Sequence, residues 1–236
     1  MKSPQAVERV RDAMAHLNEA DQDLRGLLTR QIAELGRAPD LATLAAAHGA
    51  GLGATEAALR RLHDAKALLL YPGGCLPWAV HPFALSPGSC WVETAECGYW
   101  ANCLYCGFGI AAALGKDAQI TTRLGAEGET AIYRIRSGKL INADGVFHLS
   151  VPVRQWWDNV IHACASFQPF ADEQDVAPWC ERHGFPVGHV FSLEALWRFA
   201  CDWYGRYLEI PWRTRTSQEV QELFVRHGLA GDFWQL

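Results

Sequence analysis

The chain has 236 residues, half of them hydrophobic and a fifth charged, which is ordinary for a globular protein of one large or two small domains. Its formal net charge of -5 argues against a general nucleic-acid binder or a membrane-surface protein. The first residues lack the unbroken apolar core of a signal peptide, and no apolar run is long enough to span a bilayer. We therefore expect a cytoplasmic protein that binds neither nucleic acid nor membrane.

The N-terminal third is predicted to be helical. Hydrophobic periodicity predicts helices over residues 4–17, 21–36, 41–47 and 55–67, and a strand over 68–71. Three helices followed by a hairpin are typical of a winged-helix domain, which would span residues 1–71. The helix over 55–67 would then enter a DNA groove, but it mixes basic and acidic side chains. We favour a packing or lid domain over DNA binding.

A Pro/Gly-rich stretch, residues 72–89, is typical of a linker to a second domain over residues 90–236. In that domain the hydrophobic pattern predicts strands that form one sheet and helices that pack on it. Strands are expected over 90–94, 118–124, 130–135, 146–151 and 160–167, and helices over 101–114, 153–159, 172–183, 192–207 and 216–227. A mixed or antiparallel sheet packed with helices makes the fold class α+β.

A Cys-x-x-Cys motif opens the predicted helix over 101–114. Cys103 and Cys106 are three residues apart, so both thiols would lie on one helix face and point at one ligand. The motif alone serves disulfide exchange, half of a zinc site or soft-metal capture, or holds two small buried side chains. The chain has eight cysteines and no export signal, so we expect reduced thiols. No second Cys-x-x-Cys occurs, which argues against a zinc finger.

Several segments together resemble the organomercurial (alkylmercury) lyases, which cleave carbon–mercury bonds. They are Cys103-Leu104-Tyr105-Cys106 leading into Ala111-Ala112-Ala113-Leu114-Gly115-Lys116, then Leu149-Ser150-Val151-Pro152, Cys164, and Trp179 within Ala177-Pro178-Trp179-Cys180-Glu181-Arg182-His183-Gly184. The winged-helix-like N-terminus is similar to the first domain of that family. The tail after about Leu208 adds nothing to the resemblance.

The resemblance implies an active site of two cysteines and an aspartate. The cysteines fall on Cys103 and Cys164, but the aspartate position holds Cys106. Asp158 is a carboxylate nearby in sequence, and neither alternation nor spacing places it at the site.

The reaction that the resemblance implies suits thiolates. Mercury in R–Hg⁺ is soft, so one cysteine captures it, a second weakens the Hg–C bond, and a positioned acid protonates carbon. Cys106 is then either the proton donor or a third thiolate, and Cys103, Cys106 and Cys164 are the candidate metal ligands. No cofactor is required, Hg(II) remains as bound product, and copper or zinc would bind adventitiously. The expected partners are a small organometallic substrate and a mercuric reductase or cellular thiols that remove the metal.

Two other functions stay open at this point. The same three thiols suit a non-catalytic protein that binds copper(I) or mercury. A thioredoxin-like redox role ranks third, because a clear βαβ context is missing.

The remaining candidate residues are expected to have structural roles. Tyr105 and Trp100 flank the thiols and would line an apolar pocket or simply pack, and the Trp156-Trp157 pair is expected in a core or interface. We expect neither His162 nor His183 to be a ligand. The other cysteines are expected to be packing residues: Cys75, Cys90, Cys97, Cys180 and Cys201.

Overall fold

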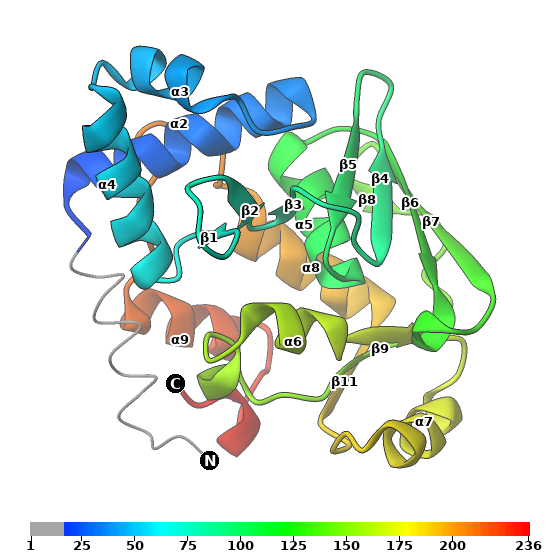
Figure 1. Ribbon diagram of the computed structural model, residues 1–236. Coiled ribbons are helices and arrows are strands. Elements are labelled where there is room, and N and C mark those ends of the chain that lie inside the picture. The colour runs from blue at the N-terminus through cyan, green and yellow to red at the C-terminus, as the bar shows by residue number, and fades with distance from the viewer. Residues whose placement is uncertain (1–16) are drawn as a thin grey trace.

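The computed structural model describes residues 17–236, and the predicted helix over 4–17 lies almost entirely outside them. Helices and two antiparallel sheets make an α+β protein, as predicted (Figure 1). Among the described residues, no helix combines the length and apolar character that a bilayer span requires.

Three helices open the described chain, in the order that the sequence predicts: α2 (Glu19–Leu35), α3 (Leu41–His48) and α4 (Leu52–Asp64). The Asn18 side chain caps α2 by accepting the Asp21 amide, and Gly36 ends it at φ 68, where a side chain would be strained. α4 begins three residues earlier than predicted, directly after Gly51. The hairpin β1 (Leu69–Leu70) and β2 (Pro77–Val80) follows.

The larger sheet has eight strands in the order β1-β2-β3-β5-β4-β6-β7-β8. Its other strands are β3 (Phe83–Ala84), β4 (Cys90–Glu93), β5 (Gly98–Ala101), β6 (Ala118–Arg123), β7 (Thr130–Arg136) and β8 (Lys139–Leu140). Strands β2 and β3 lie in the segment predicted as a linker, residues 72–89, and are mostly buried in this sheet. Strand β5 was not predicted.

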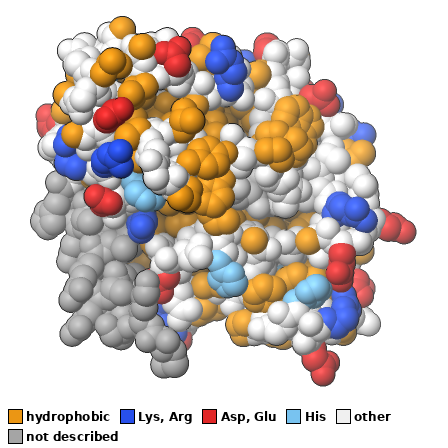
Figure 2. All heavy atoms as spheres, in the orientation of Figure 1, with side chains coloured by type: hydrophobic (Ala, Val, Ile, Leu, Met, Phe, Trp, Pro, Cys, Tyr) orange, Lys and Arg blue, Asp and Glu red, His pale blue; other side chains and the backbone are white. Residues whose placement is uncertain are grey.

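Aromatic side chains cover one visible face of this sheet. Figure 2 shows two groups of hydrophobic side chains, over β1–β2 and over β4–β5. Tyr71 stacks on Trp78 with ring centroids 5.6 Å apart, and Trp91 packs edge-on against Trp100 at 4.8 Å. Trp100 is therefore a packing residue on the sheet.

Helix α5 (Leu104–Leu114) packs against this sheet, and α8 (Leu193–Tyr204) packs on α5. α5 is apolar on all sides because β4, β5 and β6 cover one face and α8 covers another. A Cβ at Gly109 would collide with the Tyr204 ring, so this glycine permits the close approach of the two helices.

The second sheet has three strands: β10 (Gln168–Phe170), β9 (Val146–Leu149) and β11 (His189–Ser192). The prediction of a strand over 160–167 is wrong, because the chain forms helix α6 (Val160–Ala165). Asn159 caps that helix by accepting the His162 amide, and the buried residues Ala163, Cys164 and Phe167 follow helical spacing. His162 is exposed, so it does not share a face with Cys164.

The C-terminal part contains α7 (Val176–His183) and α9 (Ser217–Arg226). Thr216 and Glu219 form a capping box at the start of α9, which lies within the predicted helix over 216–227. Short 3-10 turns complete the chain: η1 (Leu124–Ala126), η2 (Val153–Gln155), η3 (Glu173–Asp175) and η4 (Asp232–Trp234).

Candidate functional site

The Cys-x-x-Cys motif lies at the start of α5, as the sequence predicts. Cys103 is the extended N-cap residue of that helix, and Cys106 lies in its first turn. The Cys103 thiol donates a hydrogen bond to Cys106, with the two sulfurs 3.6 Å apart. The helix start therefore directs both thiols to one place.

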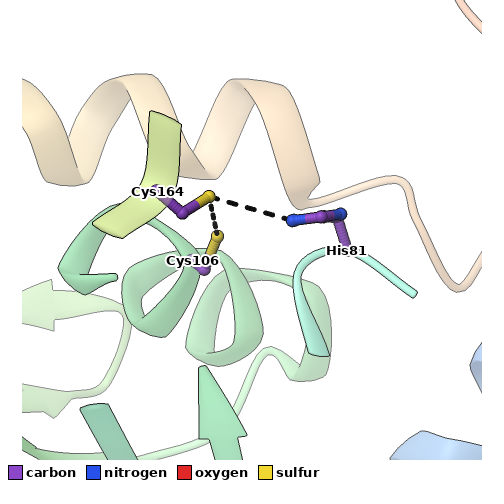
Figure 3. A group of neighbouring side chains, drawn as sticks. All are labelled: His81, Cys106 and Cys164. Carbon is purple, nitrogen blue, oxygen red and sulfur yellow. Dashed lines mark hydrogen bonds between the residues drawn. The ribbon is translucent and has the colours of Figure 1, made fainter. Parts of the chain in front are cut away.

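Cys164 on α6 joins this pair from a distant part of the chain. Its sulfur lies 4.0 Å from the Cys106 sulfur (Figure 3). The three side chains are nearly inaccessible, at 0% exposed for Cys103, 1% for Cys106 and 7% for Cys164. At about 2.3 Å per metal–sulfur bond, two sulfurs on one ion lie up to roughly 4.6 Å apart, so this spacing suits a shared soft metal.

A histidine completes the cluster, and the sequence analysis missed it. His81 lies between β2 and β3, and its Nε2 is 3.9 Å from the Cys164 sulfur (Figure 3). The ligand atoms of His81, Cys106 and Cys164 all lie within 4.8 Å of one another. Nothing in the local sequence distinguishes this histidine, because the segment around it resembles a linker.

Arg25 on α2 holds His81 in place. Its guanidinium donates to the carbonyl oxygens of His81, at 3.1 Å, and Ala67, at 3.0 Å, and lies 3.9 Å from the Trp212 ring centroid. Burial, together with the positive charge of Arg25, lowers the pKa of His81 to about 4. At neutral pH the imidazole is therefore uncharged and has a free lone pair for a metal or a proton.

The three thiols are protonated in the resting protein. Burial raises the pKa of Cys103 well above its ordinary range. Interaction with Cys103 lowers the pKa of Cys106 and raises that of Cys164. The pKa of both thiols is nevertheless well above its ordinary range, and burial contributes to the increase. A metal that binds here must displace thiol protons, so its binding releases acid.

These raised pKa values predict a loss of stability at alkaline pH. The native state keeps its thiol protons where the unfolded chain loses them, so the stabilisation is complete below the unfolded pKa and falls as pH rises above about 9. The free energy of unfolding, measured by denaturant titration, should fall more steeply above that pH than in a variant with all three cysteines changed to serine. Equal slopes would contradict the assignment.

A cavity of about 160 Å³ opens onto two of the thiols. The buried side chains at its floor are Cys106, Ala163, Cys164 and Phe167, and its aromatic walls are Tyr105, Trp156, Trp157, Trp203, Tyr204, Tyr207 and Trp212. Cys103 is not in the lining; it lies behind Cys106. The tail after Leu208 supplies part of the rim, including Arg213 and Arg215.

The described residues that line this cavity include no aspartate or glutamate. Asp158 is exposed and lines a neighbouring depression instead, so it does not supply the missing carboxylate. Tyr105 and Trp156 do line the cavity.

Among the other predicted cysteines, Cys90 is buried beside α5, in the same core cluster as the three thiols. Cys180 is buried elsewhere and contacts the His148 ring at 3.6 Å in a separate apolar group. Cys75, Cys97 and Cys201 are half-buried. His183, on α7, contacts Glu127 at 3.2 Å, and His162 is exposed on α6 and is not part of the cluster with Cys164.

Comparison with known proteins identifies the family. The model of the alkylmercury lyase family matches residues 83–205, more than half of the chain, including Cys103, Cys106 and Cys164. The chain belongs to the alkylmercury lyase family. A solved structure, the mercury-bound form of MerB2, matches with a TM-score of 0.67 and 16% identity, over 86% of this chain and 98% of that one. No curated protein matches. His81 precedes the region that the lyase family model covers, and the rim residues of the tail follow it.

Proposed function

We propose that this member of the alkylmercury lyase family cleaves a carbon–mercury bond by protonolysis at Cys103, Cys106 and Cys164. The main support is the chain of three protonated sulfurs, spaced 3.6 and 4.0 Å apart, at the floor of an aromatic cavity. The cavity provides an apolar place for the organic group, and the sulfurs provide ligands for the metal.

Cys164 is proposed to capture the substrate, because it is the most exposed of the three thiols. In this step R–Hg–X and the Cys164 thiol give Cys164–S–Hg–R and HX. The neutral His81 imidazole, 3.9 Å from the sulfur, is placed to pass the departing proton on to X, and its lowered pKa of about 4 means that it does not retain the proton.

Cys106 is proposed to supply the proton to carbon. Its thiol and Cys164–S–Hg–R give R–H and Cys164–S–Hg–S–Cys106, so the electron pair of the broken Hg–C bond takes the thiol proton. Cys103 donates a hydrogen bond to the Cys106 sulfur, which favours the thiolate that forms. Cys103 then offers a third sulfur to mercury.

A second candidate function is soft-metal binding without cleavage. The grouping of His81, Cys106 and Cys164 within 4.8 Å favours it, because two thiolates and an imidazole suit copper(I), zinc or mercury.

Single-turnover incubation distinguishes the two functions. Reduced protein mixed with phenylmercury or methylmercury should release a stoichiometric amount of benzene or methane, measured by headspace gas chromatography. Heat-unfolded protein has the same thiols without the site and serves as the control. Tight mercury binding with no hydrocarbon would contradict cleavage and support the metal-binding function.

A further inference from the structure

We propose that the organic group of the preferred substrate is an aromatic ring bearing a carboxylate, held at the cavity rim by Arg215 and Lys66. This inference deepens the proposed function and rests on it for the position of the mercury. It is argued from the charge of the described residues that line the cavity, from the volume of the cavity, and from one buried hydroxyl group that has no hydrogen-bond partner.

Four charged side chains line the cavity among the described residues, and all four are positive: Arg25, Lys66, Arg213 and Arg215. Arg213 pairs with Asp23 at 2.7 Å, and the buried Arg25 donates to the carbonyl oxygens of Ala67 and His81. Arg215 donates to the carbonyl oxygens of Trp203 and Asp202 and forms no ion pair within residues 17–236.

Lys66 forms no ion pair within residues 17–236. It is half-buried, and it lines the cavity from a different part of the chain than Arg215 does. Two unpaired cations at the rim of an apolar cavity favour an anionic ligand, because low-dielectric walls strengthen the attraction.

The hydroxyl group of Tyr105 gives independent evidence for a ligand oxygen. Tyr105 is 5% exposed and lines the cavity, and its hydroxyl oxygen is buried without a hydrogen-bond partner in the described structure. A buried polar atom without a partner is rare and costly, so a bound group is expected to satisfy it.

The size of the cavity suits a single aromatic ring. Its volume of about 160 Å³ is close to the ~150 Å³ engineered apolar cavity that binds benzene. Indole and phenol rings line its walls, and aromatic side chains pack favourably against another ring. With mercury on Cys164 at the floor, a carboxylate on the far side of the ring is expected at the rim, to which segment 213–217 contributes.

The test compares 4-carboxyphenylmercury with phenylmercury. We expect kcat/KM to favour the carboxylate by about tenfold or more, the size of one charge-assisted hydrogen bond. Arg215→Gln, which keeps an amide donor for the backbone carbonyls, and Lys66→Gln should each reduce this ratio towards one. Tyr105→Phe should reduce it as well. Arg206→Gln, an exposed arginine paired with Glu209 away from the cavity, is the matched control.

A mercury-free measurement separates this inference from the proposed function. Benzoate should bind the wild-type protein more tightly than benzyl alcohol in calorimetric titrations, and Arg215→Gln should remove the difference. Benzoate preference without cleavage of either mercurial would support the anion site and overturn the proposed function. Cleavage of both mercurials at equal kcat/KM, with no benzoate preference, would overturn the anion site alone.

Discussion

Replacing Cys164 with serine should lower the single-turnover rate of hydrocarbon release by at least ~10³-fold, as expected for the loss of a nucleophile. Serine has nearly the shape of cysteine, so the packing of α6 is kept. Its hard oxygen does not capture soft mercury. Headspace gas chromatography with phenylmercury measures the loss directly.

Cys75→Ser is the control for this substitution. Cys75 is half-buried in the turn between β1 and β2 and lies outside the cavity lining, so the rate of hydrocarbon release by this variant should equal that of the wild type. If Cys164→Ser kept more than about a tenth of the wild-type rate, the assignment of Cys164 as the capturing thiol would be wrong.

Replacing Cys106 with aspartate should preserve or raise turnover, whereas serine at this position should lower it by roughly 10²–10⁴-fold, the usual contribution of a general acid. Burial raises the pKa of a carboxyl group, so aspartate here would carry a proton that it can donate. Cys103 then supplies the second sulfur, and its thiol proton restores the acid.

Both substitutions remove the Cys106 sulfur as a metal ligand, but only aspartate can donate a proton. The difference in turnover between the two variants therefore measures the contribution of proton donation. Turnover is measured with excess small thiol to remove mercury from the product complex. If aspartate lowered turnover as far as serine does, Cys106 would act only as a metal ligand.

The cysteine helix was predictable because its signals are local. The Cys103-x-x-Cys106 spacing fixes both thiols on one side of a helix start, and an apolar run ending at Gly115 fixes its end. The family resemblance added Cys164, which no local pattern connects to the pair.

The helix containing Cys164 was mispredicted because a segment of six to eight residues with scattered apolar positions fits both the helical period of about 3.6 residues and the strand period of about two. Ile161, Ala163, Ala165 and Phe167 alternate as in a strand, yet the Asn159 cap starts a helix there. His81 and the tail could not be predicted at all. Each enters the site through a tertiary contact, His81 by Arg25 and the tail by the stacking of Trp212 on Arg25.

The contacts of Arg25 have a consequence for how the protein matures. Arg25 emerges early during synthesis and Trp212 among the last residues, so the cavity wall is incomplete until almost the whole chain has been made. Until then Cys106 and Cys164 lack the tail that covers them. A nascent chain in a cell exposed to mercury would therefore meet the metal before its own cavity can select the ligand, and cellular thiols would have to protect it during translation.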